Sequence, residues 1–253
     1  MATFVFVAGG WHGGWCWKKV ASRLRALGHE VYTPSLTGLA ERSHLFSDDI
    51  DLELHIADVS NLLRWEDLHD VNLVGHSYGG VVITGVADRN RDRVTRVVYF
   101  DALWPTDGDT VELLIGGDAD HVVLNGASAE SAPLLAAGRE TAAHMGLTDP
   151  ADIAWAAARL TPQPAGTLRQ PLRLTAPLDM EILAIECTDN APTDSGTRLS
   201  VDRAHEAAKQ RANVRVVSLH APHDAMITHP DECTRILHEA TLRCRPQRSA
   251  SDR

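Results

Sequence analysis

The sequence predicts an α/β fold: a mostly parallel sheet flanked by helices, with an inserted helical cap. Short apolar runs alternate with longer amphipathic segments along the first hundred residues and again after residue 176. Between them the alternation gives way to Asp/Gly-rich turns and alanine-rich helical segments. We therefore expect a core built from residues 1–100 and 177–243, a cap at 101–176 and a disordered tail at 244–253.

The elements follow from β-branched and aromatic runs for strands and from apolar residues one helical turn apart for helices. Before the cap we expect a strand at Phe4–Ala8, a helix with Val20, Leu24 and Leu27 on one face and ended by Gly28, a strand at Glu30–Leu36, a helix at Ile56–Leu63, a strand at Val71–Val74, a helix at Val81–Ala87 and a strand at Val94–Phe100. From the cap onward we expect a helix at Ala151–Leu160, a strand at Met180–Cys187, a helix near Val201–Arg211, a strand at Val214–Leu219 and a helix at Pro230–Leu242. Catalytic groups should lie where parallel strands end, at the carboxyl edge of the sheet.

A glycine-flanked serine is the most informative motif. Gly75-His76-Ser77-Tyr78-Gly79 directly follows an apolar strand and precedes an apolar helix. In a strand-turn-helix of this kind the glycines avoid collisions with neighbouring backbone, and the helix N-terminus points its N–H groups toward the serine. The motif predicts Ser77 as a nucleophile.

A serine hydroxyl needs a histidine to remove its proton and a carboxylate to orient that histidine. His223 follows the last predicted strand, at its carboxyl end, and is the expected base. Asp189 follows the preceding strand and is the expected acid, with Asp194 as the alternative.

The loop Ala8–Gly14 is rich in glycine and follows the first strand. We expect the backbone N–H groups of Gly10 and Tyr78 to form an oxyanion hole. A phosphate-binding loop is the rival interpretation, but the Walker spacing is absent. Trp11 and Trp104 are expected to line an apolar substrate pocket, although aromatic residues after strands equally suit a core.

Composition narrows the class of protein. Asp and Glu exceed Lys and Arg by 34 to 24, giving a net charge of −10, which argues against nucleic-acid or anionic-membrane partners. The N-terminus lacks the features of a signal peptide, no stretch approaches a membrane span, and the four cysteines show no C-x-x-C pair. We expect a cytoplasmic protein. We expect no metal, because His220, His223 and Asp224 cluster without a second ligand group.

Several longer segments carry a resemblance to a known family. They are Val7–Trp17, Pro34–His44, Gly75–Gly80, Leu160–Pro164, Cys187–Asp189 and His223–Met226. Over nearly the whole stretch from Phe4 to Leu242 the chain resembles the plant methylesterase and hydroxynitrile lyase branch of the α/β-hydrolase superfamily and its bacterial esterase relatives. The resemblance implies the α/β-hydrolase fold and a cofactor-free enzyme, often a homodimer, acting on small apolar or aromatic esters or related carbonyl compounds.

Two positions depart from that family. Ala8 stands where its members usually have a histidine, and Asn190 occupies the usual place of the acid. The favoured function is hydrolysis of carboxylic esters through an acyl-enzyme. The alternative is an acyltransferase, lactone-opening enzyme or cyclase of secondary metabolism. A hydroxynitrile lyase is disfavoured, because Asp224 and Gly10 replace the lysine and threonine of the resembling lyases. A ligand receptor is disfavoured by the presence of Ser77 and His223.

Overall fold

The structure is a computed structural model, and it describes residues 1–116, 138–189 and 195–242. The predicted tail at 244–253 and the alternative acid Asp194 lie outside the described residues.

A six-stranded sheet forms the centre of the molecule, and all of its strand pairs are parallel. The strands are β1 (Thr3–Val7), β2 (Glu30–Tyr32), β3 (Val71–His76), β4 (Val94–Phe100), β5 (Glu181–Cys187) and β6 (Val214–Leu219). They lie in the order β2-β1-β3-β4-β5-β6. The predicted mostly parallel sheet is confirmed, and β3, which leads to Ser77, lies near its middle.

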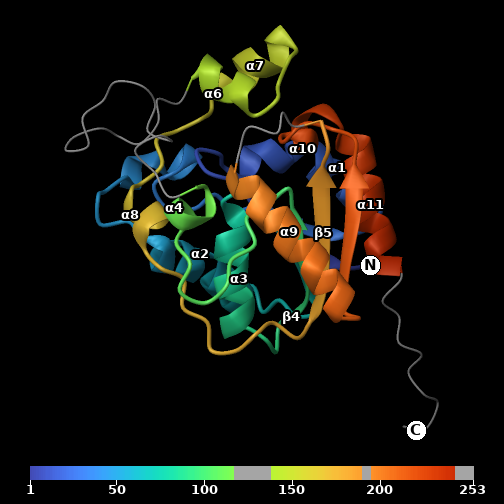
Figure 1. The fold of residues 1–253 in the computed structure, drawn as a ribbon. Coiled ribbons are helices and arrows are strands. Elements are labelled where there is room, and N and C mark those ends of the chain that lie inside the picture. The colour runs from blue at the N-terminus through green and yellow to red at the C-terminus, as the bar shows by residue number, and fades with distance from the viewer. Residues whose placement is uncertain (117–137, 190–194, 243–253) are drawn as a thin grey trace, which may run out of the picture.

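Helices connect the strands and cover both faces of the sheet (Figure 1). They are α1 (Lys18–Ala26), α2 (Leu52–Trp65), α3 (Gly79–Arg89), α4 (Val111–Leu114), α6 (Arg139–His144), α7 (Pro150–Ala157), α8 (Gly166–Arg169), α9 (Ser195–Gln210), α10 (Ala225–Thr228) and α11 (Pro230–Leu242), with short 3-10 helices η1 (Gly14–Trp17) and η2 (Ala40–Leu45). The helix expected to bury Leu27 ends one residue earlier: Leu27 is the C-cap of α1 and 52 % exposed, and Gly28 follows with φ 82°.

The pleat of the strands divides the core into two layers. Phe4 and Phe6 of β1 point toward α1 and α11, whereas the alternate residues Val5 and Val7 point toward α2 and α3. Both sets are buried to 1 % exposure or less, as is typical of a parallel sheet covered by helices on both faces.

The carboxyl ends of the strands point toward α6 and α7, which lie at the top of the molecule in Figure 1. Two backbone hydrogen bonds join this region to the loops at the sheet edge: Thr161 N–H donates to Trp11 O at 3.0 Å, and Asp224 N–H donates to Met145 O at 3.2 Å. Part of the segment predicted as a cap therefore touches the edge at which the site was expected.

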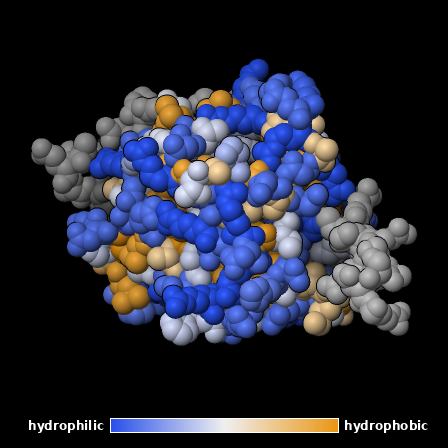
Figure 2. All heavy atoms as spheres, turned by 90° about the horizontal axis from the view of Figure 1, so that it is seen from below, coloured by the Kyte–Doolittle hydropathy of each residue, from blue (hydrophilic) through white to orange (hydrophobic). Residues whose placement is uncertain are grey.

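Figure 2 views the molecule from below, away from this edge, and hydrophilic residues cover most of that face. Within the described residues, none of the helices is both long enough and apolar enough to cross a membrane.

Candidate active site

Ser77 lies in the turn between the end of β3 and the start of α3, with φ 50°. A positive φ is strained for a serine, and the nucleophile elbow is a sharp turn of this kind. Glycine is required next to it: a Cβ on Gly79 would lie 2.7 Å from Ala8 O. The turn is held by Leu103 N–H, which donates to Ser77 O at 3.0 Å. The sequence therefore predicted the elbow correctly as a local structure.

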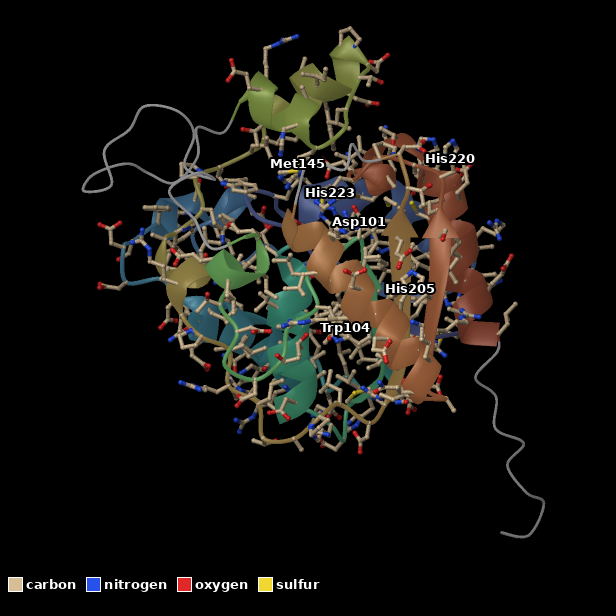
Figure 3. All side chains as sticks on the ribbon, viewed as in Figure 1. Asp101, Trp104, Met145, His205, His220 and His223 are labelled. Carbon is tan, nitrogen blue, oxygen red and sulfur yellow. The ribbon has the colours of Figure 1, made fainter. Side chains whose placement is uncertain are left out.

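His223 lies in the loop after β6, and its Nδ1 is 2.5 Å from Oδ2 of Asp101 (Figure 3). The Asp101 side chain is 2 % exposed and that of His223 is 16 % exposed. Because an ionised carboxylate only accepts hydrogen bonds, His223 carries a proton on Nδ1 in this contact, and in the neutral ring the lone pair is then on Nε2.

The main chain fixes the Asp101 carboxylate. Its Oδ1 accepts a hydrogen bond from Cys187 N–H at 3.0 Å, and its own N–H donates to Ile185 O at 2.7 Å, both at the end of β5. Along the sheet, His76 pairs with Phe100. Ser77 and Asp101 are therefore the first residues beyond two paired strand ends, and each has a positive φ, 50° and 44°.

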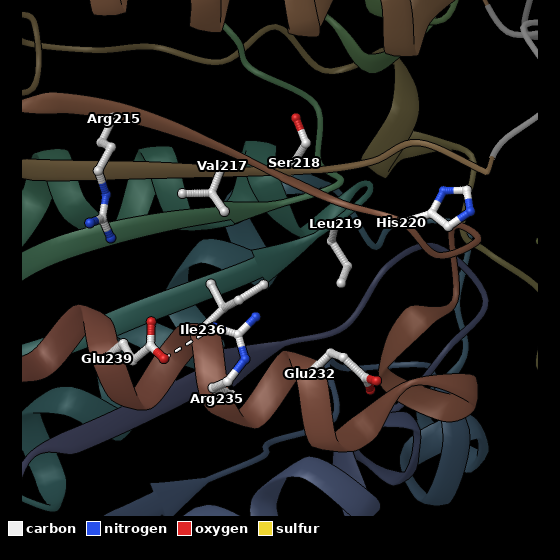
Figure 4. A pocket seen from close by; sticks show the side chains of 9 residues that line it. All are labelled: Arg215, Val217, Ser218, Leu219, His220, Glu232, Arg235, Ile236 and Glu239. Atoms are coloured by element: carbon white, nitrogen blue, oxygen red, sulfur yellow. Dashed lines mark hydrogen bonds and ion pairs between the residues drawn. The ribbon is translucent and has the colours of Figure 1, made fainter.

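The structure corrects the expected partner of His223. Asp189 contacts Nδ1 of His220 instead, at the surface, where the two side chains are 32 % and 89 % exposed. The pairing of β5 with β6 explains this: Cys187 pairs with Leu219, and Asp189 N–H continues the ladder by donating to Ala221 O at 3.1 Å. Asp189 is thereby kept beside His220, which ends a groove between β6 and α11 (Figure 4).

Sequence reasoning missed Asp101, although a signal was present. Asp101 directly follows the run Val94–Phe100, whose bounds the structure reproduces. A carboxylate directly after the strand that neighbours the serine strand is as well placed as one after the next strand, but strand order is needed to recognise it.

His76 packs against the His223 ring and hydrogen-bonds to its backbone. Their ring centroids are 4.4 Å apart, and His76 Nε2–H donates to His223 O at 3.1 Å. Burial, together with the nearby His223 and His12, lowers the pKa of His76 well below its usual value. His76 therefore stays neutral, and it adds no positive charge that would oppose protonation of His223.

The structure brings the two predicted oxyanion residues together. A Cβ on Gly10 would lie 3.9 Å from Cβ of Tyr78, and one on Gly9 would lie 2.9 Å from Cβ of Ser77. The N–H groups of Gly10 and Tyr78 donate to no acceptor within the described part of the chain. Two unused backbone donors beside a serine are what an oxyanion hole requires.

Buried side chains hold both residues in place. The Tyr78 hydroxyl donates to Nδ1 of His55 at 2.9 Å, while His55 Nε2–H donates to Thr37 O at 2.9 Å. Burial lowers the pKa of His55, which is consistent with this neutral form. On the other side, the fully buried Gln163 accepts a hydrogen bond from Trp11 N–H at 3.1 Å.

Of the two tryptophans expected at the substrate pocket, Trp11 lies in the loop Ala8–Gly14, next to Gly10, and is partly buried. Trp104 does not lie there. Its ring stacks on Tyr99, 4.4 Å between centroids, and Tyr99 bonds to Thr84 of α3 on the α2/α3 face of the sheet. The cavity that Trp104 lines is separate and includes none of Ser77, His223 and Gly10. The expectation for Trp104 is wrong because its side chain turns back into the core.

No group of three or more metal-ligating side chains was found among the residues that the structure describes.

A parallel sheet flanked by helices, with a serine in the elbow after a central strand, defines the class of α/β-hydrolase folds. The chain belongs to the alpha/beta hydrolase family, whose profile matches residues 4–236.

Several curated proteins that are similar to this chain are named as esterases. It is 51 % identical to a carbendazim hydrolyzing esterase from Nocardioides sp. over 115 residues, which is 46 % of this chain and 48 % of that protein. It is 34 % identical to the pheophorbidase of Raphanus sativus over 110 residues, 42 % of this chain and 41 % of that protein, and 32 % identical to Methylesterase 2 of Arabidopsis thaliana over 113 residues, 40 % of each. The chain thus spans less than half the length of these curated relatives. The resemblance to plant methylesterases and bacterial esterases is confirmed.

Solved structures agree on the fold along almost the whole chain. An extracellular alpha/beta-hydrolase from a Paenibacillus species matches with a TM-score of 0.75 and 23 % identity, covering 95 % of this chain and 99 % of that one. A methylesterase from Arabidopsis matches with a TM-score of 0.73 and 23 % identity, covering 96 % and 99 %.

Proposed function

We propose that this protein is a serine esterase that hydrolyses carboxylic esters of small apolar or aromatic compounds through an acyl-enzyme. The observation that carries the proposal is the buried Asp101–His223 contact of 2.5 Å at the sheet edge where Ser77 sits in its elbow. The names of the relatives, an esterase that hydrolyses carbendazim and several methylesterases, support a small ester as the substrate.

The proposed reaction uses these groups in two half-reactions. His223 Nε2 takes the proton of the Ser77 hydroxyl as Oγ attacks the ester carbonyl, and the carbonyl oxygen becomes an oxyanion held by the N–H groups of Gly10 and Tyr78. When the intermediate collapses, the ester C–O bond breaks and His223 returns its proton to the leaving alcohol. Water then attacks the acyl-enzyme by the same route, giving the free acid and restoring Ser77.

Each participant has a separate physical task. Asp101 keeps the His223 proton on Nδ1 and stabilises the imidazolium that forms during attack. An oxyanion donor contributes about 3 kcal/mol to transition-state binding in comparable sites. Trp11, next to Gly10, forms part of the apolar wall against which the acyl or alcohol group packs.

The test is mass spectrometry of the intact protein after exposure to a serine-directed fluorophosphonate. The native protein should gain one adduct, Ser77→Ala should gain none, and His223→Ala should be labelled far more slowly. Hydrolysis of short aromatic esters, measured on the same three proteins, should follow the labelling. A folded native protein that is neither labelled nor active on esters would contradict the proposal.

A further inference from the structure

A second histidine–aspartate pair lies beneath the proposed active site. Nε2 of His12 is 3.2 Å from Oδ2 of Asp224, and the two side chains are 1 % and 0 % exposed. His12 follows Gly10 by two residues, and Asp224 directly follows His223. The contact therefore joins the loop that carries an oxyanion donor to the loop that carries the base.

The hydrogen bonds fix the number of protons in this pair. His12 Nδ1 is 2.7 Å from Gly10 O, and a carbonyl oxygen only accepts, so Nδ1 carries a proton. The contact between Nε2 and Oδ2 then needs a second proton, carried either by the histidine or by the carboxyl group. In both cases the pair holds this proton and is neutral overall, which a fully buried site requires.

Among the residues that the structure describes, His12 is the titratable group that can neutralise Asp224. The titratable groups that act on it are His76, whose Nε2 lies 3.8 Å from Oδ1, and the thiols of Cys16 and Cys187. Burial raises the pKa of both thiols and lowers the pKa of His76, so all three stay uncharged. His12 is thus the group on which the Asp224 carboxylate depends.

The pair acts on a peptide group that begins at a glycine. Gly10 has no side chain to restrict its conformation. Its carbonyl is held by His12, and the N–H at the other end of the same peptide group, that of Trp11, is held by Gln163 at 3.1 Å. With both polar atoms of this peptide fixed, the preceding N–H of Gly10 keeps its direction beside Tyr78.

We propose that His12 and Asp224 are positioning residues: a buried, proton-sharing pair that clamps the oxyanion loop to the loop of the catalytic histidine. This inference rests on the proposed esterase function. It assigns to Asp224 a role other than proton transfer to substrate, because the carboxylate is covered and faces His12.

The kinetic test compares Asp224→Leu, His12→Leu and the double variant on an ester substrate. Misplacing one oxyanion donor should lower kcat roughly tenfold to a hundredfold with little change in KM, since the donor acts mainly in the transition state. If the two residues act as one clamp, the double variant should lose no more than the worse single variant. Asp224→Asn, whose amide can donate to His12 Nε2, should lose less than Asp224→Leu.

A matched control separates positioning from general damage to the core. Asp88 is also a buried acid, 5 % exposed, but it lies at the far end of α3 and bonds to Thr175 and Arg91. Asp88→Leu should lower thermal stability and leave kcat per folded molecule unchanged. The clamp is overturned if Asp224→Leu keeps the native kcat, or if the losses of the two single variants multiply in the double variant.

A measurement on the native protein covers the case in which the leucine variants do not fold. In ¹⁵N-edited spectra of the imidazole groups, assigned with His12→Gln, the His12 ring should carry a slowly exchanging proton on Nδ1, because that N–H donates to Gly10 O. A His12 ring without a proton on Nδ1, or with one that exchanges as fast as in an exposed histidine, would overturn the clamp. This measurement needs no turnover, so it distinguishes failure of the clamp from failure of the esterase proposal, which the fluorophosphonate reaction reports.

Discussion

Asp101 and Asp189 follow neighbouring strands, each faces a histidine, and their surroundings are opposite. The Asp101 and His223 side chains are 2 % and 16 % exposed, whereas those of Asp189 and His220 are 32 % and 89 % exposed. An exposed ion pair is screened by water and contributes at most about 1 kcal/mol. A buried carboxylate that also accepts a main-chain hydrogen bond keeps a single geometry. Of the two carboxylates, the enclosed Asp101 is therefore the one that holds its histidine in a fixed orientation, as the proposed mechanism requires.

The largest expected effect is on turnover. Asp101→Asn should lower kcat by about 10⁴, because an amide can donate to Nδ1 and so stabilise the wrong tautomer of His223. Asparagine also tolerates the positive φ of residue 101, so the fold should be kept. Asp189→Asn, the matched control, should stay within about twofold of the native rate. Steady-state kinetics with a chromogenic ester measures kcat of both variants. Equal losses of kcat would contradict a different role for the two aspartates.

The next effect is on stability. Asp101→Ala should lower the free energy of unfolding by about 1–3 kcal/mol, because the buried Cys187 N–H loses its acceptor. The strained φ of residue 101 adds to the loss, since alanine adopts it less readily than aspartate. Asp189→Ala should cost less than about 1 kcal/mol. Urea unfolding of the two variants compares them, and a larger loss for Asp189→Ala would contradict the greater contribution of the buried carboxylate to stability.

Low pH should also destabilise the folded protein through His76, the buried histidine that packs against His223. The pKa of His76 is lowered in the folded protein, so the unfolded chain takes up a proton first as pH falls. The stability that neutral His76 provides is complete above about pH 6.5 and is lost below it, by up to about 1.4 kcal/mol per pH unit. Unfolding free energies from pH 8 to pH 5 should therefore fall less steeply for His76→Gln than for the native protein. Identical slopes would mean that His76 does not titrate differently in the two states.

The smallest effect belongs to the surface pair. His220→Ala should change the free energy of unfolding by less than about 1 kcal/mol and leave ester hydrolysis intact, and added salt should reduce even this difference. Chemical unfolding at low and high ionic strength measures it. A loss of activity in this variant would mean that the surface pair of Asp189 and His220 contributes to catalysis.

Local patterns in the sequence predict much of this molecule. The bounds of β4, β6 and α11 coincide with the expected Val94–Phe100, Val214–Leu219 and Pro230–Leu242, because each has a regular apolar pattern and clear ends. The elbow at Ser77 and the proximity of Gly10 to Tyr78 were also predicted from local motifs.

Features that depend on strand order and register were not predicted. The choice between Asp101 and Asp189 depends on which strand adjoins β3 and on where the β5–β6 ladder ends. The prediction for Trp104 failed for a related reason. Its side chain packs into the core beside Tyr99, and the direction in which it turns depends on tertiary packing. The contact between His12 and Asp224 joins residues 212 positions apart, and no local sequence pattern predicts it.

Gln163 has a practical consequence for anyone who wishes to change what this protein accepts. Its carboxamide oxygen receives Trp11 N–H, while its Nε2 donates to Thr167 Oγ1 at 2.7 Å, so the segment returning from α7 and the loop beside Ser77 share one side chain. Libraries that remodel the residues over the site for bulkier substrates should therefore hold position 163 constant and vary its exposed neighbours. Otherwise a gain in binding would come with a displaced loop and, on the proposed mechanism, slower turnover.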